Sequence, residues 1–502
     1  MNKLPILLSK TKIMRGYRCL KSIYLTIHHP EQEAPITPDQ QALFDQGNAV
    51  GEEARKRFPG GTLVDNKPWD FFGSLKRTRE LLAQKTEVIY EAAFQYNGCY
   101  ARADIIQYSK ETQRWKIFEV KSSTKVKDEQ LDDVGLQAWI MAKGGLPIEQ
   151  ISILHINNTC RYPNLENLFI AEDVTEKMRA LYPEILGKVT DIFSTIKDAK
   201  IPDIDIGQHC TSPNECGFKD SCWKEKNIPE VSVLDLPQIK TKKWDYYSKG
   251  IIKLDDKRLT ELSPIQKRVV EVFKTGKRFI DPAGIKSVLE KWKFPLIFLD
   301  FETINPAIPR YDGASPYQQV PFQFSAHVWA SPESTLVHKE YLHTSKSDPR
   351  PNLIPALLDA CGDNGSIVAY YGQFESSRIS ELVDYSPANK KKLESLLVRI
   401  VDPLPVIRDY VYDNSFGGSF SLKAVAPAIL GKSQSYDGML VANGTAAQRA
   451  FDELTNDKTP QDRKNELIQA SLEYCKKDTL VMVELVKWLL HQSGLPAGER
   501  TI

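Results

Sequence analysis

Two carboxylates and a lysine lie close together in the first half of the sequence and could hold a metal ion beside a phosphate. Residues 100–108 (YARADIIQY) and 114–122 (RWKIFEVKS) predict two short strands joined by a polar turn. Asp104 lies in the first strand, and Glu119 and Lys121 lie two residues apart in the second, so that both leave the same face. Carboxylate oxygens bind hard divalent cations, and an ammonium group can steady a phosphate or a metal-activated water. The alternative is a surface hairpin with ordinary exposed charges.

A second group of polar side chains follows an apolar stretch, FPLIFL, in the second half of the chain. Asp300 and Glu302 come directly after this predicted strand with one residue between them, which places both carboxylates on one side of its end. Two cations about 4 Å apart could share such a pair. The sequence SLEYCKKDTLVMVELVKWLL predicts an amphipathic helix on which Tyr474 and Asp478, four residues apart, share one face. Lys423, behind a Gly-Ser loop, is a candidate phosphate contact.

Three cysteines within thirteen residues form the third chemical grouping. Cys210, Cys216 and Cys222 are interspersed with Pro, Gly and Asn in QHCTSPNECGFKDSCW, a loop that can wrap around a metal. His209 would complete a zinc site, and Cys19, just before a predicted helix, would complete a four-cysteine site. Buried free thiols are the remaining alternative. The other cysteines have no such grouping and are expected to be packing residues: Cys99, Cys160, Cys361 and Cys475.

Composition and charge agree with a folded protein of two or more domains. The chain has 502 residues, of which 41% are hydrophobic and 26% are charged, as in ordinary globular proteins. Because the net charge is +1, any surface that attracts nucleic acid must be local. Eight cysteines in a chain of this length argue against a disulfide framework. No apolar run of about 18 residues predicts a membrane span, and no signal-peptide cleavage site is apparent, so we expect a cytoplasmic protein.

The strands that carry Asp104 and Glu119 resemble the core of PD-(D/E)XK nucleases, in the RecB-like branch of that family. There a small residue, an Asp and aliphatic residues are followed by Glu-x-Lys at the end of the next strand, as in ARADII and FEVKSS. The stretch LDDVGLQAWIMAKGG is similar to the helix that carries a Gln in these nucleases; Gln137 occupies that place, and Met141 stands where the family often has Tyr. The resemblance implies a restriction-endonuclease-like fold, metal binding by Asp104 and Glu119, and supporting roles for Lys121 and Gln137.

Two further acidic residues of the first half are candidates by comparison with the same family. RecB-like nucleases often carry a Gly-rich helix that ends in His, and the helix predicted at residues 38–58 has Glu52 instead. Glu52 either takes over contact with metal or water or is a solvated helix residue. Glu91, in the strand that precedes Asp104, is a candidate third acidic neighbour of the metal.

One cysteine ahead of this core and three behind it resemble the 4Fe–4S staple of the CRISPR-associated and AddB-type RecB-like nucleases. The resemblance implies that Cys19, Cys210, Cys216 and Cys222 hold a 4Fe–4S cluster, with Zn²⁺ as the alternative. Such a cluster would clamp the two ends of the domain together and would not perform redox chemistry.

The sequence DFET resembles the first motif of DnaQ-like (DEDD) exonucleases, which have a ribonuclease H-like fold. The spacing of Tyr474 and Asp478 matches the YxxxD signature of the tyrosine-type members. The resemblance implies that Asp300, Glu302 and Asp478 are metal ligands and that Tyr474 positions the attacking water.

The middle motif departs from that family. Where Asn-x-x-Phe-Asp is expected after a strand, the stretch IVAYYGQFESSRISEL supplies Glu375. Glu can bind Mg²⁺ or Mn²⁺, although its extra methylene moves the carboxylate. Either Glu375 is the third acidic ligand, or Asp402 in RIVDPLPVIRDYV replaces it; Asp402 can instead cap the following turn.

The whole chain resembles a group of uncharacterised bacterial proteins that fuse a cluster-bearing RecB-like nuclease to a DnaQ-like exonuclease. We therefore predict an α/β protein with a RecB-like domain at residues 1–224, a connector at 225–290 and a DnaQ-like 3′–5′ exonuclease domain at 291–495. The expected function is a two-headed nuclease that uses Mg²⁺ or Mn²⁺ to hydrolyse DNA, in particular single-stranded DNA, in repair or defence and away from membranes. The alternatives are an RNA-processing exonuclease with one active head and a non-catalytic nucleic-acid-binding scaffold.

Overall fold

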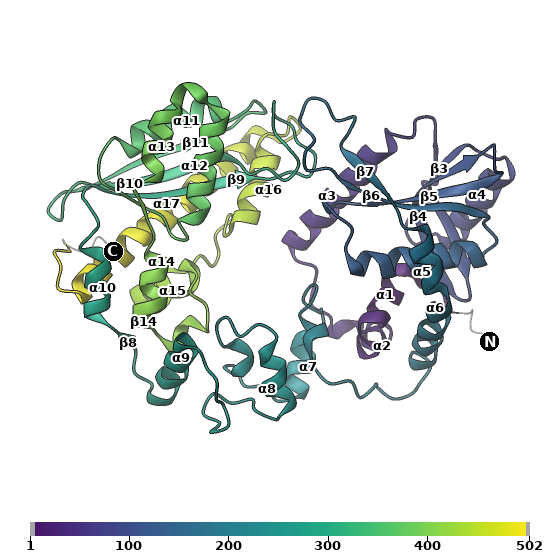
Figure 1. Ribbon diagram of the computed structural model, residues 1–502, viewed down its shortest axis with the longest axis horizontal. Helices are drawn as coiled ribbons and strands as arrows, with labels where there is room; N and C mark the ends of the chain where they lie inside the picture. Colours follow the sequence, from purple (N-terminus) through teal and green to yellow (C-terminus); the bar gives the residue numbers. More distant parts are fainter. Residues whose placement is uncertain (1–5, 498–502) are drawn as a thin grey trace. The chain divides into compact units, whose positions relative to one another are not determined.

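The computed structural model describes residues 6–497 and divides into two compact units. Unit 1 contains the residues up to Asn227 together with Pro306–Tyr317, and unit 2 contains Ile228–Asn305 together with the residues from Gln318 onwards. Both units combine helices with a mixed sheet, so the α/β class predicted from the sequence is confirmed (Figure 1).

Unit 1 is built on a seven-stranded sheet. The strands are β1 (Leu8–Ser9), β2 (Thr62–Leu63), β3 (Val88–Tyr96), β4 (Cys99–Ser109), β5 (Arg114–Lys121), β6 (Ile148–Ile156) and β7 (Phe169–Asp173). Their order is β2-β3-β4-β5-β6-β7, with β1 pairing beside β4. The pairs β3–β4 and β4–β5 are antiparallel, whereas β5 and β6 are parallel and therefore need a crossover connection.

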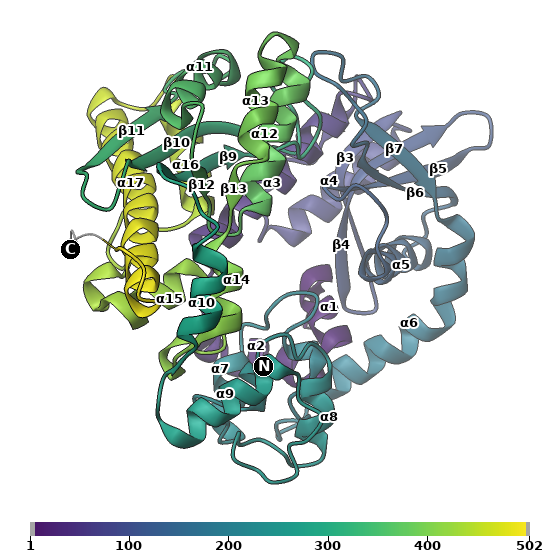
Figure 2. The ribbon, with the colours of Figure 1, turned by 60° about the vertical axis from the view of Figure 1, so that its left-hand side comes forward.

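Helices cover both faces of this sheet, which explains its apolar strands. The helices of unit 1 are α1 (Lys10–Arg18), α2 (Leu20–His28), α3 (Pro38–Arg55), α4 (Phe71–Ala83), α5 (Asp128–Lys143), α6 (Thr175–Thr195) and α7 (Lys219–Glu225), with short 3₁₀ turns η1 (Pro30–Gln32) and η2 (Gln208–Cys210). The crossover between β5 and β6 is α5, which packs beside α6 (Figure 2). In β4, Ile106 joins the core that includes α5, whereas its neighbour Ile105 joins the core under α3.

Unit 2 is built on a five-stranded sheet in the order β11-β10-β9-β12-β13. These strands are β9 (Leu296–Ile304), β10 (Val320–Trp329), β11 (Leu336–Leu342), β12 (Ser366–Val368) and β13 (Ile400–Val401). The strands β9, β12 and β13 are parallel, and β10 runs antiparallel to both of its neighbours. A separate antiparallel pair joins β8 (Phe279–Ile280) to β14 (Val411–Tyr412).

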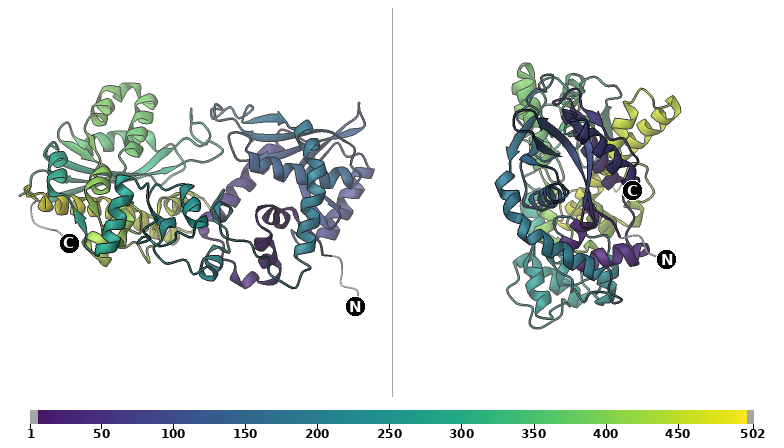
Figure 3. Two further views of the ribbon diagram at one scale, coloured as in Figure 1. Left: turned by 60° about the horizontal axis from the view of Figure 1, so that its bottom comes forward. Right: turned by 90° about the vertical axis from the view of Figure 1, so that its right-hand side faces the viewer.

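Some helices of unit 2 cover the two faces of this sheet, and the others pack elsewhere in the unit. The helices are α8 (Lys242–Ser248), α9 (Pro264–Thr275), α10 (Pro282–Leu289), α11 (Arg350–Cys361), α12 (Gln373–Tyr385), α13 (Lys390–Leu397), α14 (Pro403–Tyr410), α15 (Leu422–Leu430), α16 (Gly444–Leu454) and α17 (Gln461–Gln492). Four short 3₁₀ turns complete the unit: η3 (Val233–Asp235), η4 (Pro387–Asn389), η5 (Asn414–Phe416) and η6 (Lys432–Gln434). Helices α11, α12 and α13 cover one face, and the long helix α17 packs on β9 and β10 from the other (Figures 1 and 3).

Alternation along β9 decides which side its acidic residues take. Ile297, Leu299 and Phe301 belong to the core shared with α11, α12 and α13. Because successive side chains of a strand point to opposite faces, Asp300 and Glu302 point to the face that α17 covers.

The division between the two units is not a single cut in the chain. Residues 228–290 of the predicted connector are part of unit 2, where α9 starts with a capping box at Ser263 and ends at a left-handed Gly276. Residues 306–317, between β9 and β10, are part of unit 1, where Ala307 and Tyr317 pack in the core under α3. None of the helices between residues 6 and 497 is long and apolar enough to cross a lipid bilayer.

Candidate functional site

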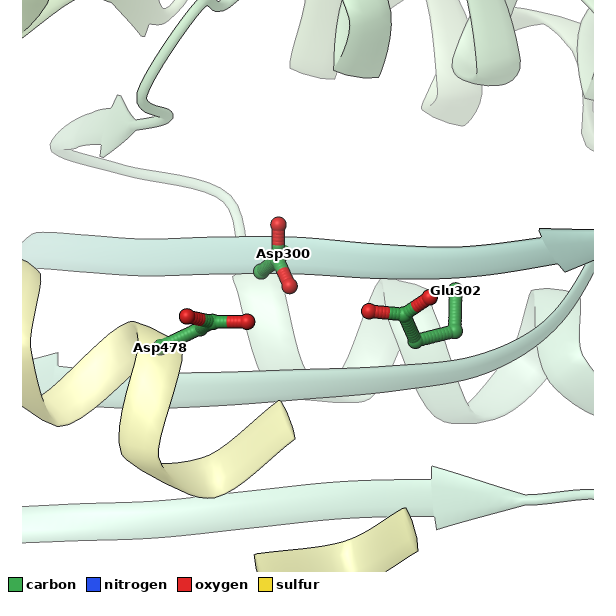
Figure 4. Close-up of side chains that lie close together, drawn as sticks. All are labelled: Asp300, Glu302 and Asp478. Carbon is green, nitrogen blue, oxygen red and sulfur yellow. The ribbon is translucent and has the colours of Figure 1, made fainter. Parts of the chain in front are cut away.

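Three acidic side chains of unit 2 converge between β9 and α17. Asp300 and Glu302 leave the strand, and Asp478 leaves the helix toward them (Figure 4). One carboxylate oxygen from each residue lies within 4.8 Å of the other two. Glu302 and Asp478 are buried and Asp300 is half-buried. The structure thus brings together two sequence motifs that are more than 170 residues apart.

The negative charges of the three carboxylates repel one another, which disfavours the ionised form of each. Burial raises the pKa of Asp300 well above its usual value, and the charge of Asp478 raises it further. Burial and the charge of Asp300 likewise raise the pKa of Glu302 well above its usual value. Lys423 offsets part of this effect, but its ammonium donates hydrogen bonds to the Ala442 carbonyl (2.6 Å) and the Tyr474 hydroxyl (3.1 Å). Buried oxygen donors with excess negative charge are the set that Mg²⁺ or Mn²⁺ requires.

Glu375 adds a fourth buried carboxylate at the start of α12. Its side chain is 2% exposed, and its Oε2 atom has no hydrogen-bond partner. Burial raises the pKa of Glu375 well above its usual value, and the nearby charge of Asp300 raises it further. Glu375 is therefore an electrostatic neighbour of the cluster, although its oxygens are not part of the group within 4.8 Å.

The carboxylate of Asp402, the alternative to Glu375 as the third acidic ligand, accepts hydrogen bonds from backbone amides. It caps α14 by accepting a hydrogen bond from Leu404 N (2.8 Å), and it also accepts from Tyr371 N (3.1 Å) and Gly372 N (3.0 Å). Both of its oxygens are used in this way. Since Gly372 directly precedes α12, Asp402 fixes the turn from which Glu375 projects.

Aromatic and basic side chains surround the cluster on the α17 side. Tyr474 is buried, and its ring lies 6.0 Å from that of Tyr436 in an edge-to-face arrangement. The ammonium groups of Lys423 and Lys477 each lie 5.0 Å from the centre of the Tyr436 ring. Sequence reasoning missed Tyr436, because SQSYDGM contains no spacing that points to the distant acids. It also assigned Cys475 to packing, although this thiol lies 3.8 Å from Asp300 Oδ2.

In unit 1 the strands β4 and β5 bring Asp104 beside Glu119. Asp104 Oδ2 accepts a hydrogen bond from Val120 N at 2.7 Å across the strand pair. Burial raises the pKa of Asp104 to about 8, with the charge of Glu119 adding to the effect. Glu119 itself is 3% exposed. The predicted pair of neighbouring carboxylates is thus present at this point in the sheet.

Both oxygens of Glu119 are engaged by the protein. Lys10 and Lys121 each donate to Oε1 at 2.9 Å, and Gln137 Nε2 donates to Oε2 at 2.6 Å. Burial alone would raise the pKa of Glu119, but the ammonium groups of Lys10 and Lys121 lower it to about 2. Lys121 also donates to Asp133 at 2.6 Å, so the site brings together two ammonium groups and three carboxyl groups.

Lys10 and Asp133 were missed by sequence reasoning. Lys10, the first residue of α1, donates to Gln137 Oε1 at 2.7 Å and to Asp133 at 3.2 Å in addition to Glu119. A signal for Asp133 was present, because it lies four residues before Gln137 and therefore shares its face of α5.

The remaining candidates of unit 1 lie farther from these groups. Glu52 is exposed on α3, and Met141 is fully buried in the core. Glu91 pairs with Arg55 at 2.9 Å, and its charge slightly raises the pKa of Asp104. Among the residues that the structure describes, only the unit 2 cluster brings three acidic, cysteine or histidine ligand atoms within 4.8 Å of one another.

Cys19, Cys210, Cys216 and Cys222 line one cavity of unit 1, together with His209. All four are free thiols, and burial raises the pKa of Cys19, Cys210 and Cys222, the last to about 11. Cys19 stands at the junction of α1 and α2, and Arg18 donates hydrogen bonds to the carbonyls of His209 and Asn214 in the cysteine loop. The four sulfur atoms thus line one cavity, but no three of the possible ligand atoms described there lie within 4.8 Å of one another. The other cysteines are buried: Cys99, Cys160, Cys361 and Cys475.

Comparisons with known proteins cover only parts of the chain. Residues 297–421 match a family described as a domain of unknown function (DUF2779). This match includes Asp300, Glu302 and Glu375 but ends before Asp478. The chain is also 24% identical over 218 residues to the "Uncharacterized protein MG366 homolog" of Mycoplasma pneumoniae, an alignment that covers 40% of this chain and 33% of that protein. The chain thus spans about a third of the length of this curated relative.

Proposed function

We propose that this protein is a two-headed, metal-dependent nuclease that hydrolyses phosphodiester bonds of DNA. The observation that carries the proposal is the buried group of Asp300, Glu302 and Asp478, with Tyr474 one helical turn before Asp478. Unit 2 would be the DnaQ-like head, which removes nucleotides from the 3′ end of single-stranded DNA, and unit 1 would be the RecB-like head.

The arrangement of the strands supports the finer fold assignments. In unit 2 the motif strand β9 is central, β10 alone is antiparallel, and two parallel strands follow, as a ribonuclease H-like fold would have. In unit 1 an antiparallel run, β3-β4-β5, precedes the crossover helix α5 and the parallel strand β6, as a restriction-endonuclease-like fold would have.

The residues of unit 2 have distinct roles in this proposal. Bound Mg²⁺ or Mn²⁺ would supply Lewis-acid activation of a water and neutralisation of charge on the phosphate. Asp300, Glu302 and Asp478 would hold the cations, with Glu375 as a further acid. The Tyr474 hydroxyl accepts a hydrogen bond from Lys423 and donates one to Asp478, and from this position it would orient the attacking water.

In unit 1, Asp104 and Glu119 would hold the cation, and Lys121 would contact the phosphate. Gln137 would orient Glu119 through the hydrogen bond that it donates to Oε2. The four cysteines around one cavity support a 4Fe–4S cluster as a structural clamp, since Cys19 and the cysteine trio come from opposite ends of this part of the chain. Zn²⁺ bound with His209 is the alternative.

A second candidate is a nuclease with only the unit 2 head active, acting on DNA or RNA. It is favoured by one observation: both oxygens of Glu119 already accept hydrogen bonds from Lys10, Lys121 and Gln137.

The test is cleavage of 5′-labelled single-stranded DNA and RNA in Mn²⁺ by protein purified without oxygen. Wild type is compared with Asp300→Ala, Glu119→Ala and the double variant. A 3′-shortening ladder lost in Asp300→Ala but kept in Glu119→Ala supports the unit 2 head, and internal cuts lost in Glu119→Ala but kept in Asp300→Ala support the unit 1 head. Equal absence of cleavage in wild type and all variants contradicts the proposal and leaves a binding scaffold.

A further inference from the structure

Lys10 contacts the acidic site of unit 1, which is the group of Asp104, Glu119 and Asp133. Its ammonium group donates to Glu119 Oε1 (2.9 Å), Gln137 Oε1 (2.7 Å) and Asp133 (3.2 Å). The same Oε1 atom also accepts from Lys121. Lys10 therefore holds both the carboxylate and its orienting amide, and it places a positive charge where a cation would meet Glu119.

The helix that carries Lys10 ends at the cysteine cavity. Lys10 is the first residue of α1, and Cys19 follows the last residue, Arg18. Arg18 fixes this end by donating to the His209 and Asn214 carbonyls. The other end is held by β1, in which Ser9 pairs with Tyr100 of β4, the strand that carries Asp104.

Helix α1 depends on these attachments to keep its form. It has nine residues, fewer than the roughly 12 that an isolated helix needs to be stable in water. In its last turn, Gly16 packs so closely on Ile192 of α6 that an added Cβ would come within 2.6 Å of that side chain. Release of the Cys19 end would remove one of the attachments that hold α1, and with it Lys10, in place.

We propose that Lys10 is a positioning residue that weakens divalent-cation binding at the unit 1 acidic site, and that α1 makes its position depend on the cysteine cavity. This inference rests on the proposed function of unit 1 as a metal-dependent site. The occupant of the cysteine cavity, through α1, sets how firmly Lys10 competes with a cation for Glu119. The clamp then affects the acidic site as well as the stability of the unit.

The first test measures Mn²⁺ binding by the loss of the free-ion EPR signal, without nucleic acid. The parent is the full chain with Asp300→Asn and Asp478→Asn, which removes binding by unit 2. Adding Lys10→Met should tighten Mn²⁺ binding about tenfold or more, because a nearby positive charge is removed. Lys10→Arg, which keeps the charge, and Lys12→Met, an exposed lysine of the same helix, should bind as the parent does.

Glu119→Gln locates the measured ion, because it should abolish the binding gained in the Lys10→Met protein. Equal or weaker Mn²⁺ binding after Lys10→Met, including no binding by either protein, overturns the proposal. Absence of DNA cleavage by wild type would refute the proposed function by a separate measurement, so the two failures are distinguishable.

The second test is a double-mutant cycle between the two ends of α1. Cys19→Ser in the parent should shift Mn²⁺ affinity in the same direction as Lys10→Met, and it should have no further effect once Lys10 is Met. If Cys19→Ser does not fold, Arg18→Gln takes its place in the cycle, because it removes the contacts with the cysteine loop. Additive effects, or no effect of either change on the parent, contradict the coupling.

Discussion

Replacing Asp300 by Asn should stabilise unit 2 in the absence of divalent cations while removing its response to them. The oxygens of Asp300, Glu302 and Asp478 lie within 4.8 Å of one another. At that separation, and with an effective dielectric constant of about 20, each pair of unit charges repels by about 3.5 kcal/mol. Proton uptake relieves part of this repulsion, since burial and mutual charge raise the pKa of these groups. We therefore expect Asp300→Asn to stabilise unit 2 by about 2 kcal/mol at pH 8.

Differential scanning calorimetry in EDTA and in Mn²⁺ measures both effects. A gain of about 2 kcal/mol corresponds to a rise of about 4–8 °C in the melting temperature of a unit of this size. Mn²⁺ should raise the melting temperature of wild type by binding only the folded state, and it should raise that of Asp300→Asn far less. Asp462→Asn, an exposed carboxylate on the same helix as Asp478, is the matched control and should behave as wild type.

The reasoning is refuted if Asp300→Asn melts below wild type in EDTA. It is equally refuted if Mn²⁺ stabilises the variant as much as wild type, because the cation would then bind without this carboxylate.

Three further predictions address other parts of the structure. Asp402→Ala should destabilise unit 2 by about 2 kcal/mol in urea unfolding, because three amides lose their acceptor; a change below about 0.5 kcal/mol would contradict the capping role. Wild type should contain about four iron atoms per chain with visible absorbance, both lost in Cys19→Ser; about one zinc ion instead would exclude the cluster. Burial lowers the pKa of His327 to about 3 and that of His338 to about 4, so only the unfolded chain takes up these protons between about pH 6.5 and 4. The stability advantage of wild type over His327→Asn should therefore shrink as pH falls through that range, and a constant difference would contradict it.

Local sequence was sufficient to find the acidic residues of unit 2. Asp300 and Glu302 are positioned by the alternation of one strand, and Tyr474 and Asp478 by the turn of one helix, so their spacing carries the information. That the two elements meet depends on tertiary packing, which the resemblance to a known family supplied and the residues alone did not.

The residues that were missed are those positioned by long-range contacts. Lys10 meets Glu119 across 109 positions of the chain, and nothing near Lys10 indicates that partner. Whether Asp402 binds a cation or caps a helix depends on where Tyr371 N and Gly372 N lie, which its neighbours in sequence do not reveal. The assignment of residues 306–317 to unit 1 depends on packing of the same kind.

The most direct test of the central claim compares two carboxylates on one helix. The rate of nucleotide release from the 3′ end of single-stranded DNA in Mn²⁺ is measured for wild type, Asp478→Asn and Asp462→Asn. Because Asp478 belongs to the buried cluster and Asp462 is exposed, we expect a loss of at least about 100-fold in Asp478→Asn and the wild-type rate in Asp462→Asn. Wild-type release by Asp478→Asn, or no release by any of the three proteins, would contradict the assignment of this cluster as a nuclease site.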